Sequence, residues 1–433
     1  METMLTLHVN PQKFKVHSLT GRITPALLAD AFRAVKRNRG AAGIDRVSIS
    51  LYEINLAANQ WKLLDDLKQR RYQPQPLRRV FIPKGQGKFR PLGIPTVRDR
   101  VAQEVVRRLL TPVFEALFQE NSFGFRPGRD CHQAVGKVLS YMEQGFQWVI
   151  DADIKGFFDA IPHHLIMRMV SAEIADGNIL TLIEKFLRSG VMEEGVRKPT
   201  VSGTPQGGVI SPLLANIVLN HLDWRLHAQG CKFVRYADDF VVLCKSRAEA
   251  EKALELVRLV IETELELELH PEKTKILPLW QGFDFLGFHI SSRTVKMRAK
   301  SRENFKTKIR LLTPRHRNLD EQCIGKLNRV IRGTVNYFST TFSTTADQFD
   351  KLDRWLRKRV RCMKFKRISH RDNFRLKNQH LDRLGLLRGL NLSAEVKERR
   401  RLSPNQTRTV IGQEQSHWGR PVRESRTLVN MGN

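Results

Sequence analysis

Cysteine is scarce in this sequence and is never clustered. The 433 residues include five cysteines, at positions 131, 231, 244, 323 and 362. Structural zinc needs closely spaced Cys and His ligands, and a disulfide framework needs a dense, even set of cysteines. We therefore expect neither kind of site, and we expect a reducing compartment.

Long apolar segments are also missing. No apolar run approaches the about 20 residues that span a bilayer, and there is no lipidation signal or amphipathic anchor. Residues 1–8 have neither the basic nor the apolar part of a secretory leader. We expect no membrane partner and no secretion.

Acidic residues are scarce in the last third of the chain, where basic residues abound. Residues 291–433 contain 35 Lys and Arg against 12 Asp and Glu, whereas residues 1–290 contain 39 against 32. Most of the formal net charge of +30 therefore lies in one third of the sequence. Such a concentration is typical of a surface that binds a polyanion such as nucleic acid.

The apolar residues that are present are numerous enough for several cores. Hydrophobic residues make up 41% of the chain, and a chain of this length usually forms two or three domains. Apolar stripes with helical spacing occur at 26–39 and 248–261. The alternating glutamates of 262–268 predict the exposed face of a strand.

A pair of adjacent carboxylates interrupts residues 231–245. Two runs of apolar, β-branched and aromatic residues, 233–234 and 240–243, flank Asp238 and Asp239. This pattern predicts two strands that reverse at the acidic pair. Aspartates are also common in exposed turns, so the hairpin alone leaves a functional and a simply solvated interpretation open.

A second run with carboxylates precedes the hairpin. Residues 148–155 alternate with the period of a strand, which places Asp151 and Asp153 on the same face. A carboxylate at a strand end beside two more can bind hard ions such as Mg²⁺. Two such ions roughly 3.5–4 Å apart promote phosphoryl transfer. Spacing alone does not choose between Asp151 and Asp153.

These motifs resemble a known family. The segment Tyr236-Ala-Asp-Asp239, with Asp153 upstream, resembles the catalytic centre of reverse transcriptases, and residues 30–370 resemble the bacterial group II intron branch. The hairpin and the block at 203–216 are the most specific matches. The resemblance selects Asp153, and it implies that Asp153, Asp238 and Asp239 hold two Mg²⁺ ions, for which Mn²⁺ could substitute. One departure is Arg46, where the family usually has glycine.

The resemblance also implies contacts with the triphosphate. Residues 78–95 form two β-like runs around a Gly-rich tip. Such a basic hairpin is either simply exposed or able to close over phosphates. In the family a Lys and an Arg at this spacing contact the phosphates of the nucleotide, and here they are Lys84 and Arg90. Lys273 is expected at the phosphates as well, with Lys275 as its competitor.

Two further residues are expected near the rest of the nucleotide. By the same resemblance, Phe158 lies under the sugar, where a ring collides with the 2′-OH that distinguishes ribonucleotides. A place in the core is the other interpretation of this phenylalanine. Gln206 is expected beside the pair that nucleotide and template form.

Two basic regions are expected to contact nucleic acid. Arg126 and Arg129 lie in a Pro/Gly turn of a block that resembles the family, and RNA contact and ordinary loop charge both fit them. Farther along, 324–338 and 349–363 carry apolar helical stripes with cations on their other faces. That pattern suits a thumb lying along a duplex backbone. The expected contacts there are Arg354, Arg357, Lys358, Arg361 and Lys364.

The fold that the resemblance implies is α+β. It is a right-hand polymerase (fingers, palm, thumb) with an antiparallel palm sheet, a helical thumb or maturase (X) domain and a basic C-terminal tail. The expected units are an N-terminal extension with the start of the fingers at 1–75, fingers at 76–150, a palm with part of the fingers packed on it at 151–295, the helical thumb or maturase domain at 296–385, and a DNA-binding or partly disordered tail at 386–433.

The predicted function is RNA-directed DNA polymerisation, together with intron RNA binding as a maturase that supports splicing and retrohoming. Expected partners are an RNA template, above all a structured group II intron RNA, a DNA primer or target, and deoxynucleoside triphosphates. No pattern specifies an oligomeric state. The expected location is the bacterial cytoplasm, with the nucleoid or a ribonucleoprotein.

Two alternatives stay open. One is a relative domesticated for DNA repair or phage defence, which Arg46 and the unusual tail favour. The other is a maturase that binds RNA without polymerising. The sequence has no Cys/His cluster of the His-metal nuclease type, which argues against target cutting by this chain.

Overall fold

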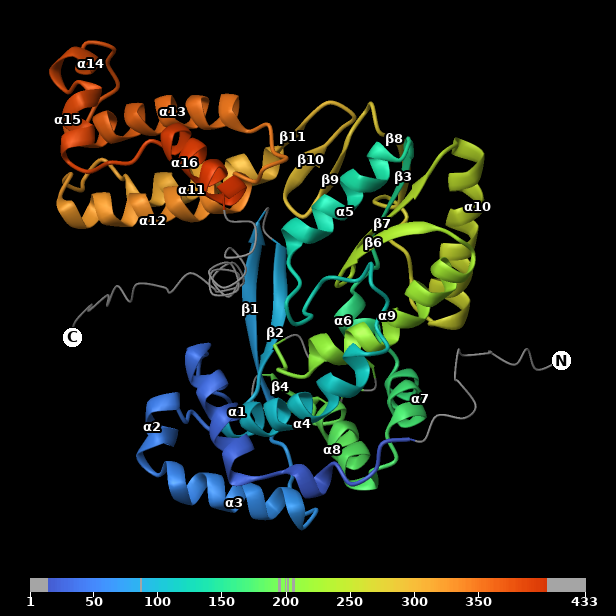
Figure 1. Cartoon of the computed structure of the whole chain (residues 1–433). Helices are drawn as coiled ribbons and strands as arrows, with labels where there is room; N and C mark the ends of the chain where they lie inside the picture. The colour runs from blue at the N-terminus through green and yellow to red at the C-terminus, as the bar shows by residue number, and fades with distance from the viewer. Residues whose placement is uncertain are drawn as a thin grey trace.

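The described part of the chain forms a mixed α/β structure with three small sheets and with helices before and after them (Figure 1). The computed structural model describes residues 15–402, except 86, 87, 194, 195, 199, 201, 205 and 206. Among these residues no helix is long and apolar enough to cross a membrane. All five cysteines are free.

The described chain begins with helices that pack around α4. Thr24 caps α1, since its hydroxyl accepts a hydrogen bond from the Leu27 amide (3.2 Å), and Pro25 occupies the first turn. The apolar stripe of α1 is buried, which confirms the helix predicted at 26–39. The elements of this part are η1 (Thr20–Arg22), α1 (Pro25–Arg37), α2 (Ile49–Ile54), α3 (Leu56–Lys68) and α4 (Val97–Glu115).

A long hairpin leads away from these helices toward the C-terminal part of the molecule (Figure 1). Strands β1 (Leu77–Gly85) and β2 (Lys88–Ile94) pair antiparallel, as the two basic runs predict. Strand β1 also pairs in parallel with β4 (Val191–Glu193), which pairs with β5 (Val196–Lys198). The first sheet thus has the order β2-β1-β4-β5.

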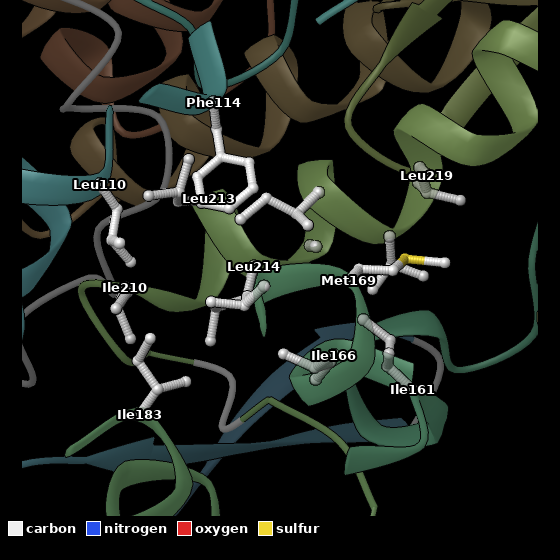
Figure 2. Packing of buried hydrophobic residues seen from close by; sticks show 14 of the residues in the cluster. Leu110, Phe114, Ile161, Ile166, Met169, Ile183, Ile210, Leu213, Leu214 and Leu219 are labelled. Carbon is white, nitrogen blue, oxygen red and sulfur yellow. The ribbon is translucent and has the colours of Figure 1, made fainter. Parts of the chain in front are cut away.

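Four helices share one apolar core beside this sheet. Figure 2 shows Phe114 of α4, Ile166 of α7 (His163–Glu173), Ile183 of α8 (Gly177–Leu187) and Leu214 of α9 (Ser211–Ala228) gathered around a common interior. All four side chains are almost fully buried. Because α9 is buried nearly all round, it anchors the sheet strands that follow it.

The second sheet has the order β6-β7-β3-β8 and is antiparallel throughout. Its residues alternate between two cores: Ile150 and Val242 join the core of α9 and α10, whereas Val149 and Val241 face α5. The strands are β3 (Trp148–Ala152), β6 (Lys232–Tyr236), β7 (Asp239–Cys244) and β8 (Lys275–Pro278). The helices around them are α5 (Cys131–Glu143), the short α6 (Phe157–Ala160) and α10 (Arg247–Arg258).

The strand predicted at 262–268 is wrong. A short π-helix, η2 (Leu259–Glu264), continues α10, and directly after the predicted strand Leu269 makes an isolated bridge to Ile154. The side chains of Leu265, Leu267 and Leu269 are buried between exposed glutamates, so the alternation of burial is present without a strand ladder.

The last part of the described chain is helical and rests on a third sheet. Strands β9 (Phe283–Phe285), β10 (Phe288–Ile290) and β11 (Val295–Met297) form this antiparallel sheet. The apolar stripes predicted at 324–338 and 349–363 are buried in α12 and α13, which confirms both helices. The helices are α11 (Ala299–Leu312), α12 (Glu321–Phe338), α13 (Ala346–Phe365), α14 (Asp372–Arg375), α15 (Asn378–Arg383) and α16 (Gly389–Leu402).

Two of the predicted boundaries do not coincide with the elements. Strand β3 crosses the expected border between 150 and 151 and belongs wholly to the second sheet. The expected tail at 386–433 begins too early, because α16 packs against α12 and α13 and buries Val396. Residues 403–433 lie outside the described residues.

Candidate functional site

The acidic pair lies on the hairpin between β6 and β7. Tyr236 pairs with Asp239, so only Ala237 and Asp238 form the turn, and Ala237 takes a left-handed conformation (φ 58°). This is the reversal that the sequence predicts. Asp238 is half-buried, and Asp239 is exposed at the start of β7.

The upstream carboxylates lie on the neighbouring strand. In the β3–β7 ladder Ala152 is opposite Phe240 and Asp151 is opposite Val241, so Asp153, one residue further, follows the strand end beside Asp239. Facing residues in an antiparallel ladder have Cα atoms about 4.5–5.5 Å apart. Asp151, Asp153 and Asp239 line one open cleft of about 760 Å³, together with Glu272 and Asp284.

The carboxylates of this cleft disfavour one another's charge. Although part of Asp239 is exposed to solvent, the protein that surrounds its carboxyl, and then the negative charges of Asp238 and Asp153, raise the pKa of Asp239 to about 6. Burial, then the charges of Asp239, Asp284 and Asp153, raise the pKa of Asp151 to about 7. The negative charges of these neighbouring aspartates therefore repel one another, and a bound cation would relieve that repulsion.

Lysines partly offset this charge, each at its own carboxylate. The Lys273 ammonium donates to Asp153 Oδ2 at 2.7 Å, and both side chains are partly exposed. Lys275 is opposite Asp151 in the β3–β8 ladder and lowers the pKa of that carboxyl. Lys273 and Lys275, the two candidates for contact with the phosphates, are thus beside different aspartates.

A buried ion pair supports the hairpin from behind. Arg235 and Asp223 of α9 both have fully buried side chains, and Arg235 Nε donates to Asp223 Oδ1 at 2.8 Å. The same guanidinium donates through Nη1 to the Ala237 carbonyl (3.0 Å) and to Asn216 Oδ1 (2.8 Å). One buried cation therefore ties α9 to the turn that carries Asp238.

Sequence reasoning did not find this pair, although one signal was present. Asp223 is a charged residue within a helix that is otherwise apolar over most of its length. A buried carboxylate needs a partner. That partner is Arg235, the strand cation nearest to the acidic turn.

The turn also rests on the block at 122–126. The Phe123 amide donates to the Arg235 carbonyl (2.8 Å), and Asn216 Nδ2 donates to the Gly124 carbonyl (2.8 Å). A Cβ at Gly124 would lie 2.3 Å from the Ala237 backbone nitrogen, so only glycine allows this approach. The block is thus part of the support of the hairpin.

Phe158 lies on α6, directly after the segment that bears Asp153. Its ring is half-buried and packs edge-on against Phe157, whose side chain is in the core. The Thr204 amide donates to the Phe158 carbonyl (2.7 Å), so the loop that begins at Gly203 docks on this turn. Gln206, expected in that loop, lies outside the described residues.

The other expected phosphate ligands lie on the β1–β2 hairpin. Lys84 is in β1, and Arg90 is in β2 opposite Ile82. Only the backbone of these two positions belongs to the described part of the chain. Their roles stay predictions.

The two arginines of the Pro/Gly turn differ in what they contact. Arg126 is buried: its guanidinium forms an ion pair with Glu115 (2.7 Å) and donates to the carbonyls of Gln119 and Ser122. This favours a structural role over the expected RNA contact. Arg129 is half-buried above the ring of Phe123 (5.3 Å), at the surface of the same loop.

The five expected thumb cations are not equivalent. Arg357 and Arg361 are buried, and they donate to Asp382 and to Asn378 respectively (both 2.6 Å). Arg354, Lys358 and Lys364 are exposed. Four of the five, all except Lys364, line one cavity along α13.

The donor set of the cleft fits divalent ions in its chemistry. Asp153 and Asp239 supply carboxylate oxygens on adjacent strand ends, and Asp238 adds to the negative field at Asp239. Within the described ranges, however, no three His, Cys, Asp or Glu side chains are grouped closely enough to hold a metal ion. Asp153 would have to exchange Lys273 for the metal.

Two family profiles match separate parts of the chain. Residues 82–290 match the reverse transcriptase (RNA-dependent DNA polymerase) family. Residues 302–385 match the group II intron, maturase-specific domain. The first match covers the second sheet with the acidic hairpin, and the second covers α12 to α15.

Two curated relatives are similar to more than half of the chain. Protein YkfC of Escherichia coli K12 is 36% identical over 320 residues, which cover 64% of this chain and 84% of YkfC. Group II intron-encoded protein LtrA of Lactococcus lactis subsp. cremoris is 34% identical over 322 residues, 58% of this chain and 54% of LtrA. The chain thus spans about half the length of LtrA. A telomerase structure from Candida albicans covers 73% of this chain and 64% of its own at 14% identity and a TM-score of 0.41, too weak a likeness to bear on the fold.

Proposed function

The chain belongs to the group II intron family of reverse transcriptases, RNA-directed DNA polymerases with a maturase-specific domain, and from this premise we propose how its residues act. The arrangement is a right-hand polymerase: the second sheet is the palm, the β1–β2 hairpin belongs to the fingers, and α11–α16 form the thumb and maturase unit. The substrates are an RNA template, a DNA primer and deoxynucleoside triphosphates.

Asp153, Asp238 and Asp239 would hold two divalent ions, for which Mg²⁺ is our proposal. When bound, such ions lower the cost of ionising the primer 3′-OH and of the charge that develops on the triphosphate. The observation that carries the assignment is the ladder that sets Asp153 beside Asp239, with the raised pKa of Asp239 as its electrostatic consequence.

The other residues position the reactants. Arg235 fixes the turn, so that Asp238 and Asp239 keep their place when charge accumulates in front of them. Lys273 leaves Asp153 and follows the triphosphate, to which Lys84 and Arg90 also donate. Phe158 lies below the sugar and excludes a 2′-OH by contact.

Primer extension on poly(rA)/oligo(dT) tests this proposal. The wild-type chain should incorporate dTTP in the presence of Mg²⁺, and Asp238→Ala should lower the rate at least about a thousandfold, as removal of a catalytic group does. Glu251→Gln, which removes an exposed carboxylate of α10 that pairs with Arg247, is the matched control. Extension by Asp238→Ala at the wild-type rate would show that the metal assignment is wrong.

A second function, binding of a structured intron RNA as a maturase, is favoured by the family match at 302–385 and by the basic helices there. Splicing of a group II intron at low Mg²⁺ should then depend on the protein. It should not depend on Asp239, because holding RNA needs no phosphoryl transfer by the protein. Loss of splicing stimulation with Asp239→Asn would contradict two separable functions.

A further inference from the structure

The helical unit contains a cavity that is distinct from the acidic cleft. Its volume is about 650 Å³, and it lies between α13, the segment that leads through α14 to α15, and the start of α16. In Figure 1 this corner is at the far end of the helical unit from the second sheet. A volume of this size is typical of sites for small organic groups.

Cations dominate the lining of this cavity. Seven Lys and Arg residues face three Asp residues there, and His370 and Cys362 are the other titratable groups of the lining. The aspartates are occupied: Asp350 pairs with Arg354, Asp372 with Arg367, and Asp353 accepts the amides of Gly389 and Leu390 (2.8 and 2.9 Å). The cavity therefore presents a positive potential to a ligand.

Two of the cations are well placed to meet a ligand. Lys358 and Lys377 are exposed, and among the described residues neither forms an ion pair. Arg357 and Arg361, by contrast, are buried in the wall, where Asn378 and Asp382 hold them. The wall is thus rigid and positive, while the two lysines are free to follow a phosphate.

An aromatic ring lies at the edge of the cavity. Phe374 belongs to α14, lines the cavity and is 79% exposed. The turn around it is fixed, because Asp372 is buried and accepts a hydrogen bond from Arg367 (3.1 Å). An uncovered ring on a fixed turn beside cations is the combination on which unstacked bases of single-stranded nucleic acid bind.

The cavity opens on a different flank of α13 from the one that faces the cleft. A second depression, lined by Lys351 and Trp355 on the other flank of α13, shares Lys296, Arg302 and Gln348 with the acidic cleft. The Phe374 cavity shares no lining residue with either of them. A duplex in the cleft would therefore leave the Phe374 cavity accessible to another strand.

We propose that this cavity captures one unpaired nucleotide of an RNA strand. The base stacks on Phe374, and the flanking phosphates contact Lys358 and Lys377. A duplex does not fit the same place, since its bases are stacked inward and offer no ring to Phe374. That the nucleotide belongs to an RNA strand rests on the proposed function. The preference for an unstacked nucleotide follows from the cavity itself.

Fluorescence titrations of the full-length chain test this proposal. The probes are a 12-nucleotide oligo(rA) with one central 2-aminopurine and a blunt RNA duplex of the same length. Phe374→Ala should raise the Kd for the oligo(rA) about tenfold and remove the quenching of 2-aminopurine, because stacking is lost. Phe374→Tyr should keep both, and Lys358→Ala should raise the Kd about threefold and flatten its salt dependence. Duplex affinity should stay within twofold.

Matched controls separate this site from general effects. Trp280→Ala removes another exposed ring (76% exposed) and Lys252→Ala another exposed cation, and both should leave oligo(rA) binding unchanged. Equal affinity of wild type and Phe374→Ala, or an equal loss with Trp280→Ala, would overturn the proposal. If AMP displaced the oligo(rA) at equal concentration, the ligand of the cavity would be a free nucleotide, which would contradict the proposal of an RNA strand.

The same samples distinguish this site from the polymerase. Phe374→Ala should extend poly(rA)/oligo(dT) at the wild-type rate, since the cavity shares no residue with the cleft. If the wild-type protein fails to extend the primer but quenches 2-aminopurine through Phe374, the proposed polymerase function fails and the cavity assignment stands.

Discussion

Two ion pairs, one behind the acidic hairpin and one in front of it, are opposites in their exposure to solvent. Behind the turn, Arg235 and Asp223 are completely buried. In front, the side chains of Lys273 and Asp153 are 57% and 33% exposed. A buried pair cannot exchange partners without a large cost, whereas an exposed pair exchanges readily. The back of the hairpin therefore fixes geometry, and the front is available for ligands.

Removal of the buried cation should have the largest effect on stability. Arg235→Met should lower the free energy of unfolding by about 3–5 kcal/mol, because Asp223 would stay buried without a partner. Denaturant unfolding measures this loss. The double variant Arg235→Met/Asp223→Leu should recover most of the stability but not the polymerase activity, since the Ala237 carbonyl still lacks its donor. Full recovery of both would mean that the pair does not position the turn.

Phe158 tests whether a front residue changes selectivity without changing the fold. Phe158→Ala should increase ribonucleotide incorporation relative to deoxynucleotide about 10- to 100-fold, because the excluded 2′-OH gains room. Single-turnover incorporation of dTTP and UTP measures the ratio. Phe158→Tyr keeps the ring and is the control. An unchanged sugar ratio in Phe158→Ala would assign this residue to the core.

The front carboxylates should make stability depend on pH when divalent ions are removed by EDTA. The pKa of Asp239, about 6, lies above its ordinary value of 3.8, so the folded state binds this proton more tightly. The protonated Asp239 therefore contributes to the free energy of unfolding below about pH 4, and this contribution is lost as the pH rises through about 6.

Asp239→Asn should remove the decrease in stability between about pH 4 and pH 6. Relative to wild type, the variant should gain about 1 kcal/mol at pH 8 and little at pH 4; the figure is reduced because solvent screens the exposed carboxylate. Thermal unfolding at both pH values measures the difference, with Glu251→Gln on α10 as the carboxylate control. An equal gain at both pH values would contradict repulsion within the cleft.

The exposed pair should matter least for stability. Lys273→Ala should change the free energy of unfolding by less than about 0.5 kcal/mol. It should raise the KM for dTTP about twofold to fivefold, equivalent to at most ~1 kcal/mol. Lys275→Ala, whose lysine is opposite Asp151, is the matched comparison. A larger KM effect from Lys275 than from Lys273 would reverse the assignment.

Local patterns predicted the parts of the fold in which one face is buried. The strands on both sides of Asp238, the helix α1 and the stripes of α12 and α13 follow from hydrophobic periodicity alone. The glutamates at 262–268 show where this fails: burial alternates there, but no neighbouring strand completes a ladder. Helix α16 was missed because its basic sequence buries only a narrow strip against α12 and α13.

The acidic residues of the site could be predicted from the sequence. The buried residues that hold the acidic hairpin in place could not. The family resemblance indicated Asp153, and the ladder places it beside Asp239. No local pattern distinguishes a buried arginine from an exposed one: Arg126 was expected on RNA and is buried on Glu115, and Arg235 was not singled out. Such pairings join residues of different elements, so they depend on tertiary packing.

The location of divalent ions tests the central claim most directly. We propose crystals of the chain with an RNA template, a DNA primer and a non-hydrolysable dTTP analogue in Mn²⁺, and an anomalous difference map. Two Mn²⁺ peaks roughly 3.5–4 Å apart should lie within coordination distance of Asp153, Asp238 and Asp239, with Lys273 displaced from Asp153. Metal peaks elsewhere, with the ion pair of Lys273 and Asp153 intact, would contradict the account.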